Sequence, residues 1–343
     1  GHLSEVLAVC ASTGDTSAAA ALYAAYLQPN VKSAVLLPHK KVTTQQLSQP
    51  LGSGARVFEI PGVFDDCMKV VEALSERYNV ALLNSKNAWR ILGQESYSYE
   101  IAQDFQYKMA DKAVVVPIGN AGNISALMSG FLKFYEAEII EHLPKIIGVQ
   151  SEHANPVYRY YLEPDEAKRK FEPVTVRPSV AQAAMIGNPV SMPRVIHLAR
   201  QYNETDGQKR VFVVQVTEQQ IMDWQLSANR NGHISCPHGG ECLAGLMTAK
   251  QEGIIGPGDR SVLDSTAHAL KFAGFQDMYF NRNLPQAYEI LPDSDLINTP
   301  LLVRPEGLDK YPEPGKPLRG KDLDSFVDRM AAEIAKDLKL KAT

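Results

Sequence analysis

The chain has 343 residues, with 35 lysines and arginines against 39 aspartates and glutamates. Its formal net charge is therefore −4 at pH 7, which argues against nucleic acid or an anionic membrane as a partner. With 45% apolar and 22% charged residues, and without an apolar run long enough to cross a bilayer, the composition is typical of a soluble globular protein. Its four cysteines have no Cys-x-x-Cys spacing, which argues against a disulfide framework and favours a reduced, cytoplasmic compartment.

Short apolar strands alternate with helices through the first third of the chain. Turns rich in Gly, Asn and Pro separate them, and this alternation predicts parallel strands joined by crossover helices. We expect strands at 5–10, 33–38, 55–60 and 80–84, and helices at 15–27, 43–51, 63–78 and 91–109.

A second series of the same kind begins at residue 112. We expect strands at 112–118, 145–151 and 261–264, a helix at 124–140, and further helices between 151 and 261. A boundary near 108–112 predicts a smaller α/β lobe, 1–110, and a larger α/β lobe, 111–343. The larger lobe ends in a tail, 297–343, whose prolines and charged helix at 322–340 are typical of a solvated terminal helix.

Hydroxyl side chains crowd the turn after the first strand, in the segment CASTGDTSAAA. Ser12, Thr13, Asp15 and Thr16 stand where a strand ends and a helix begins. The free amides and the dipole of a helix start both attract an anion. Plain N-capping explains one such residue, and this segment has several, so we favour an anion site here.

The segment GNAGN, residues 119–123, follows the strand KAVVVPI directly. Glycines let the backbone turn sharply, and successive amides at a helix start then form a concave nest that suits a phosphate. The segment matches neither a dinucleotide-binding fingerprint nor a Walker loop. An ordinary Gly/Asn turn explains the pattern equally well.

Polar residues also follow the strand that ends near residue 84. Asn84 and Ser85 are followed by Arg90 at a helix start. An arginine with amide and hydroxyl donors beside it can hold a phosphate or a carboxylate. Taken by itself, the segment is better explained by a helix cap and a surface arginine.

Two later segments contain reactive side chains. In DSTAHALKF, Thr266 stands at a strand end, where hydroxyls of α/β proteins often face a ligand, while His268 and Lys271 are the possible base and amine. In ISCPHGGECLAGL, Cys236, His238 and Cys242 have the wrong spacing for a closed zinc set, so we expect no metal. A structural role is the more common explanation for a single histidine or lysine.

These segments, in this order, resemble those of threonine synthase, a pyridoxal-phosphate (PLP) enzyme of the tryptophan-synthase-β-like fold, fold type II. The resemblance implies a two-lobed α/β fold of parallel sheets with helices on both faces. It implies that the PLP phosphate is held by Gly119, Asn120, Ala121, Gly122 and Asn123. It also places Asp15, where many relatives have Asn, near the 3′-oxygen of PLP, and the hydroxyl of Thr266 at its pyridine nitrogen.

The substrate that the resemblance implies is O-phospho-L-homoserine. Its phosphate is then held at Ser12, Thr13, Thr16, Asn84, Ser85 and Arg90. The implied reaction is a lyase step of threonine biosynthesis, in which phosphate is eliminated from Cγ and water is added at Cβ to give L-threonine. PLP supplies the carbanion chemistry. A homodimer is the assembly that we consider.

The sequence departs from this family at one point. The Schiff-base lysine of the family lies in a Phe-Lys-Asp-like segment before the Ser-Thr-Gly-Asp loop, and no lysine precedes Ser12 here. Lys86 and Lys271 do not match the family position. We therefore expect an N-terminally shortened chain that has no catalytic lysine of its own, because that lysine lies upstream of Gly1, and that is inactive alone.

Two alternatives stay open. The first is a relative that acts on another amino acid, such as a threonine dehydratase or a β-replacement enzyme, whose substrates carry no distal phosphate. The second is a non-catalytic PLP-binding relative, which holds the ligand without turnover.

Overall fold

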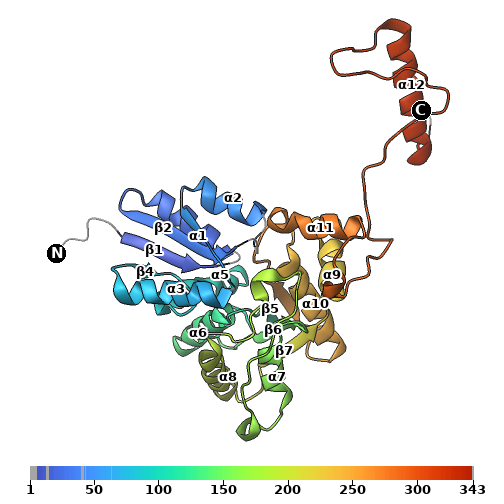
Figure 1. The fold of residues 1–343 in the computed structure, drawn as a ribbon. Coiled ribbons are helices and arrows are strands. Elements are labelled where there is room, and N and C mark those ends of the chain that lie inside the picture. The colour runs from blue at the N-terminus through green and yellow to red at the C-terminus, as the bar shows by residue number, and fades with distance from the viewer. Residues whose placement is uncertain (1–5, 13–14, 40–41, 43, 63, 342–343) are drawn as a thin grey trace. The chain divides into compact units, whose positions relative to one another are not determined.

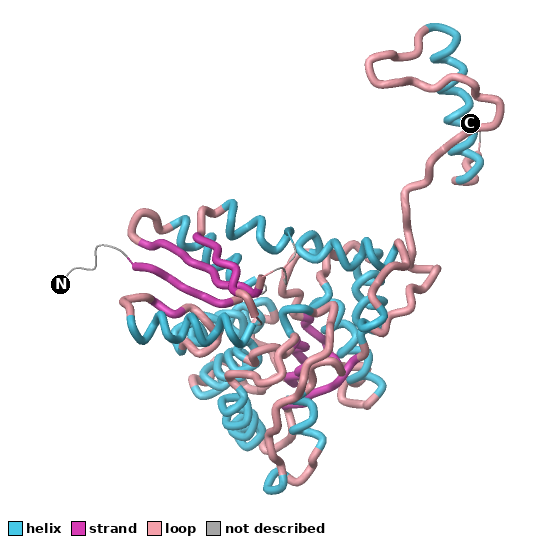
Figure 2. The backbone as a smooth tube through the Cα atoms, viewed as in Figure 1, coloured by secondary structure: helices cyan, strands magenta, loops and turns pink. Residues whose placement is uncertain are grey.

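The computed structural model describes residues 6–12, 15–39, 42, 44–62 and 64–341. The chain forms two compact units, residues 1–296 and residues 297–343. The first unit contains two four-stranded sheets, and every strand pair in them is parallel. Figure 2 shows these strands surrounded by helices. The predicted α/β class with parallel sheets is confirmed.

The first sheet has the strand order β3-β2-β1-β4. Its strands are β1 (Val6–Ala11), β2 (Val31–Pro38), β3 (Arg56–Ile60) and β4 (Ala81–Leu82). The helices between them are α1 (Asp15–Tyr26), α2 (Thr44–Gly52) and α3 (Phe64–Arg77). Figure 1 shows α2 and α3 on opposite sides of the sheet.

Alternate residues of β1 pack against the two helix layers. Val9 packs with Cys67 and Val71 of α3, whereas Cys10 packs with Ala21 of α1. Successive side chains of a strand point to opposite faces. A strand that is covered on both faces therefore reads as a continuous apolar run, as VLAVCA does.

The second sheet has the order β7-β6-β5-β8. One face packs in a large apolar core with α6 (Gly122–Glu136) and α8 (Met192–Asp206), and the other face contacts α10 (Pro237–Gln251). Helix α9 (Glu218–Arg230) packs against α10. The strands are β5 (Lys112–Pro117), β6 (Lys145–Ser151), β7 (Val211–Val216) and β8 (Arg260–Leu263).

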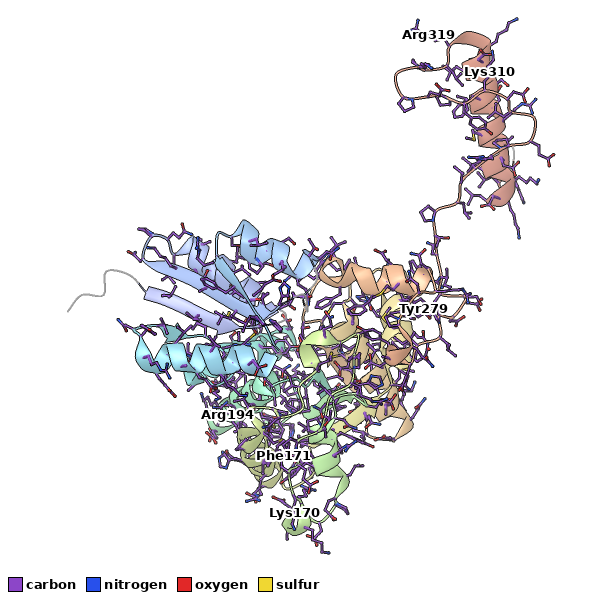
Figure 3. All side chains as sticks on the ribbon, viewed as in Figure 1. Lys170, Phe171, Arg194, Tyr279, Lys310 and Arg319 are labelled. Carbon is purple, nitrogen blue, oxygen red and sulfur yellow. The ribbon has the colours of Figure 1, made fainter. Side chains whose placement is uncertain are left out.

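Shorter helices complete the first unit. They are α4 (Ala88–Gln94), α5 (Ser96–Asp104), α7 (Pro156–Leu162) and α11 (Ala273–Phe280), with the 3₁₀ turn η3 at Ala269–Phe272. Tyr279 of α11, labelled in Figure 3, is buried and its hydroxyl donates to Asp223 of α9 over 2.7 Å. The second unit contains α12 (Gly320–Asp337). Among the described residues, no helix is both long and apolar enough to cross a membrane.

Several predicted elements differ from the observed ones. Where one helix was expected at 91–109, the structure has two. The first begins after its cap residue Asn87, and Glu95 both ends this helix and precedes the second. The second helix ends at residue 104 because Gln106 and Tyr107 have positive φ. Residues 211–216 form a strand where only helices were expected, since VFVVQV is a short buried run rich in valine. The division into lobes at residue 110 stays a prediction.

Glycines of the segment 234–246 let α10 approach its neighbours closely. A methyl group on Gly240 would lie 2.4 Å from the carbonyl oxygen of Ile221 in α9. A methyl group on Gly245 would lie 2.2 Å from Cγ2 of Val149 in β6. The packing of α10 therefore requires residues without a side chain at these positions.

We predict that Gly240→Ala lowers the free energy of unfolding by about 1–3 kcal/mol, because the backbone of α9 must move away from the added methyl group. Urea unfolding measures this change. The matched control is Gly274→Ala in α11, where no atom lies within 4 Å of the added methyl group. The control is expected to be neutral, or stabilising by up to about 1 kcal/mol. Equal losses in the two variants would contradict the packing argument.

Candidate active site

One cavity of about 930 Å³ in the first unit collects most of the predicted site residues. Its wall includes the start of α1, the turn between β4 and α4, the turn between β5 and α6, and the residues after β8. Parallel strands present their carboxyl ends at one edge of a sheet, and ligands of α/β proteins bind at that edge. The cavity is therefore formed by four turns of one kind.

The turn after β5 has the geometry of a phosphate-binding loop. Ala121 adopts the left-handed conformation, with φ 64°, directly before α6 begins at Gly122. The first amides of a helix have no partner within it, so they are available to a ligand. A methyl group on Gly119 would lie 3.0 Å from the main-chain oxygen of Ala183. The side chain of Asn123 fixes the turn, since its Nδ2 donates to the carbonyl of Pro117 over 2.8 Å.

The second polar cluster is centred on Arg90. Its guanidinium donates to Thr16 Oγ1 over 3.1 Å and to Ser85 Oγ over 3.2 Å. Burial lowers the pKa of Arg90, and the charged groups that shift this pKa include no carboxylate. Among the described residues, the side-chain partners of this half-buried guanidinium are hydroxyls, and a cation with such partners can bind an anion.

The helix start beside this cluster orients Arg90. Asn87 caps α4, and its side-chain oxygen accepts from the amides of Trp89 and Arg90. Asn84 Oδ1 accepts from the amide of Lys86 over 2.9 Å, so that side chain fixes the turn. Capping thus holds the first turn of α4, and with it the arginine, at the cavity wall.

Asp15 and Thr266 lie on the wall of the same cavity. Asp15 is the first residue of α1, and its Oδ1 accepts from the ammonium of Lys271 over 2.6 Å. The Thr266 side chain is exposed, and its hydroxyl is 4.0 Å from the sulfur of Cys236. Residues from the two ends of the first unit therefore meet at this cavity.

Buried ionisable groups lie at and behind the wall near Thr266. Burial raises the pKa of Asp264 to about 6, although a hydrogen bond from the Asn123 side chain acts in the opposite direction and lowers this pKa. Burial lowers the pKa of His238, whose Nε2 accepts from the amide of Ala183 over 3.1 Å. Burial also raises the pKa of Glu241, one turn along α10, to about 8. This side of the cavity therefore favours neutral side chains.

The structure brings most of the predicted site residues to this one cavity. Its lining includes Asp15, Thr16, Ser85, Arg90, Gly119, Asn120, Ala121, Gly122, Asn123 and Thr266. Ser12 and Asn84 are buried and are not among the lining residues. Thr13 lies outside the described residues.

Sequence reasoning gave no cavity role to several other lining residues. These include Tyr23, Trp89, Gln94, Tyr97, His238 and Asp264. His238 was weighed only as a metal ligand. It lies 3.5 Å from the sulfur of Cys236, while the Cys242 thiol donates to the carbonyl of Asp264 over 3.3 Å. The aromatic residues lie in helices. Their spacing is that of ordinary packing residues and does not indicate a cavity. His268, weighed as a base, caps η3 instead.

The fold has two parallel sheets, and the cavity brings two clusters of donors together. Comparison with known proteins identifies the family. The family of pyridoxal-phosphate dependent enzymes matches residues 3–266, and the chain belongs to this family. The chain is 36% identical to threonine synthase 2, chloroplastic, of Arabidopsis thaliana over 277 residues, which are 81% of this chain and 51% of that protein. It is also 36% identical to threonine synthase of Methanocaldococcus jannaschii over 266 residues, which are 76% of this chain and 62% of that protein.

A solved structure gives the same result. The crystal structure of threonine synthase from Escherichia coli superposes with a TM-score of 0.63 and 26% sequence identity, over 79% of this chain and 60% of that chain. The fold is therefore that of PLP-dependent fold type II enzymes, as expected. The chain spans about half to three fifths of the length of these relatives.

We predict that the free energy of unfolding of the unmodified protein, compared with that of the Glu241→Gln variant, falls as the pH rises. Glu241 is fully buried, and its pKa is about 8 in the folded chain against an ordinary 4.5. The folded state thus binds more protons between these values, so stability is lost there as pH rises, by about 1.4 kcal/mol for each pKa unit that separates the two states. Urea unfolding of both proteins at pH 5 and pH 8.5 measures the difference.

The control for this experiment is Glu252→Gln, which removes an exposed carboxylate from the end of the same helix. Its stability relative to the unmodified protein is expected to stay nearly constant over the same pH range. If the difference in free energy of unfolding between Glu241→Gln and the unmodified protein does not grow with pH, ionisation of the Glu241 carboxyl group does not destabilise the fold, and the prediction is wrong.

Proposed function

We propose that this chain carries the cofactor and substrate sites of a threonine synthase, a PLP-dependent lyase that converts O-phospho-L-homoserine and water to L-threonine and inorganic phosphate. The observation that carries the proposal is the pair of separate donor clusters in one cavity: the turn 119–123, and Arg90 with the hydroxyls of Thr16 and Ser85. A coenzyme phosphate occupies one site, and a substrate with its own phosphate occupies the other.

The residues around the turn 119–123 fit the phosphate of PLP. The free amides at the start of α6 would donate to it, and the absence of a side chain on Gly119 lets the main chain at Ala183 pack against the turn. By the resemblance, Asp15 would hold the 3′-oxygen of the ring, and the hydroxyl of Thr266 would meet the pyridine nitrogen. When bound, PLP would supply the electron sink that stabilises a carbanion on the substrate. A hydroxyl, unlike a carboxylate, would not enforce protonation of the ring nitrogen.

Arg90, Ser85 and Thr16 serve the substrate. Their donors hold the distal phosphate and orient the bond between Cγ and oxygen for cleavage. The phosphate carries more negative charge as it leaves, and a half-buried guanidinium stabilises that charge. Amino acids without a distal phosphate would leave this cation uncompensated, which disfavours a dehydratase or a β-replacement enzyme.

A second candidate function, PLP binding without turnover, is supported by the positions of two lysines. Lys86 pairs with Glu72, and Lys271 pairs with Asp15, so each ammonium already has a carboxylate partner. Threonine formation from O-phospho-L-homoserine by the 343-residue chain would exclude this candidate. Binding of both ligands without turnover agrees with both candidates, because no lysine precedes Ser12 in this chain.

We predict that Arg90→Ala weakens binding of O-phospho-L-homoserine to the PLP-loaded chain by about tenfold to a hundredfold, the effect of losing a charge-assisted hydrogen bond of about 1.5–3 kcal/mol. Binding of L-homoserine, which has no phosphate, is expected to change little. Isothermal titration calorimetry measures both affinities.

The control for that experiment is Arg200→Ala, which removes an exposed arginine that pairs with Glu166 in another part of the unit. It is expected to leave both affinities unchanged. If Arg90→Ala weakens the two ligands equally, the cluster does not recognise a distal phosphate, and an enzyme for unphosphorylated amino acids becomes the better account.

A further inference from the structure

Lys271 and Asp15 form an ion pair at the edge of the cavity. The Lys271 ammonium lies 2.6 Å from Asp15 Oδ1, although 256 residues separate the two in the chain. Both side chains are largely shielded from solvent, with 25% and 30% of their surface exposed. Lys271 stands in η3, whose next residue, Phe272, is buried with its ring 5.1 Å from that of His238. The lysine is therefore held on an element that packs against the cavity wall.

The carboxylate of Asp15 would be unfavourable in this cavity without a partner. The ligand proposed above is anionic, and its 3′-oxygen ionises beside Asp15. A like charge at close range weakens binding and disfavours the ionised form of the ligand hydroxyl. The Lys271 ammonium makes the pair formally neutral. Among the hydrogen bonds of the described residues, that of Lys271 reaches Oδ1 only, and Oδ2 is the atom that could face the ligand.

We propose that Lys271 is a positioning residue of the cofactor site, which neutralises Asp15 and orients its carboxylate toward the 3′-oxygen of the ligand. This inference rests on the proposed function, since it takes the bound ring to lie beside Asp15. It assigns Lys271 a role that requires the amine to stay charged and non-covalent. Lys271 is therefore not a substitute for the Schiff-base lysine of the family.

The test uses pyridoxamine 5′-phosphate, which has the ring, the 3′-hydroxyl and the phosphate of PLP but no aldehyde that could react with lysines. Its affinity is measured by fluorescence titration in five forms of the 343-residue chain. They are the unmodified chain, Lys271→Met, Lys271→Arg, Asp15→Asn, and the double variant that combines Lys271→Met with Asp15→Asn. With both groups ionised where present, the net charge at the pair is 0, −1, 0, +1 and 0 respectively.

Lys271→Met is expected to weaken binding about tenfold or more, because it leaves Asp15 uncompensated. The double variant restores neutrality and is expected to recover most of that loss. Lys271→Arg, which keeps the charge, is expected to stay within about threefold of the unmodified chain. A double variant that binds no better than Lys271→Met would overturn the proposal.

A matched control separates this effect from a loss of stability. Lys145→Met breaks a similar ion pair, in which the ammonium is 2.7 Å from Asp259 and the two side chains are 23% and 14% exposed, and neither residue lines the cavity. Its affinity for the probe is expected to be unchanged. If Lys271→Met and Lys145→Met behave alike, the inference fails.

The absorbance of the bound probe gives a second readout that a merely structural role would not move. An uncompensated Asp15 raises the pKa of the 3′-hydroxyl, so its ionisation is expected at higher pH in Lys271→Met and to return in the double variant. The other ionisable groups on this wall are His238, Asp264, Arg90, Tyr23 and Tyr97, and every variant keeps them. Failure of the probe to bind the unmodified chain would instead reject the proposed function.

Discussion

Strand direction is the constraint on which the site depends. In both sheets the strands run parallel, so their carboxyl ends, and the starts of the helices that follow, lie at the same edge. Helix starts carry unpartnered amides and a favourable dipole. The turns after β1, β4, β5 and β8 therefore concentrate donors in one cavity, although they are far apart in the chain.

Burial then decides which of the cavity groups carry charge. It raises the pKa of Asp264 and lowers that of His238, so both are biased toward their neutral forms. Arg90 is half-buried, and the hydroxyls that its guanidinium contacts cannot neutralise it. The cation available to an anionic substrate is thus on the α4 side of the cavity, while the turn 119–123 offers amide dipoles instead of charged side chains.

Local sequence patterns predicted the elements that have strong local causes. The alternation of buried runs with helices predicted the parallel sheets, and the polar turns 12–16, 84–90 and 119–123 were identified because hydroxyls, amides and glycines cluster after a strand. The pattern did not reveal β7, since VFVVQV has the length of a strand but lies between helices. It also did not separate α4 from α5, because the chain keeps helical dihedrals at Glu95.

Contacts between distant segments could not be predicted in the same way. Nothing local in STAHALKF indicates that Lys271 reaches Asp15, and nothing in α4 indicates that Arg90 reaches Thr16 in α1. Asp264 looks like any residue at a strand end until its burial is known. These properties depend on how the sheets and helices pack around one cavity, and the residue pattern of a single segment does not contain that information.

The central claim is that one cavity holds two phosphates at separate places. A crystal structure of the chain with pyridoxamine 5′-phosphate and O-phospho-L-homoserine tests it most directly. The account predicts one phosphate on the amides of 119–122 and a second between Arg90, Ser85 and Thr16, with the ring between Asp15 and Thr266. A single shared phosphate position, or a ring bound away from Asp15 and Thr266, would contradict it.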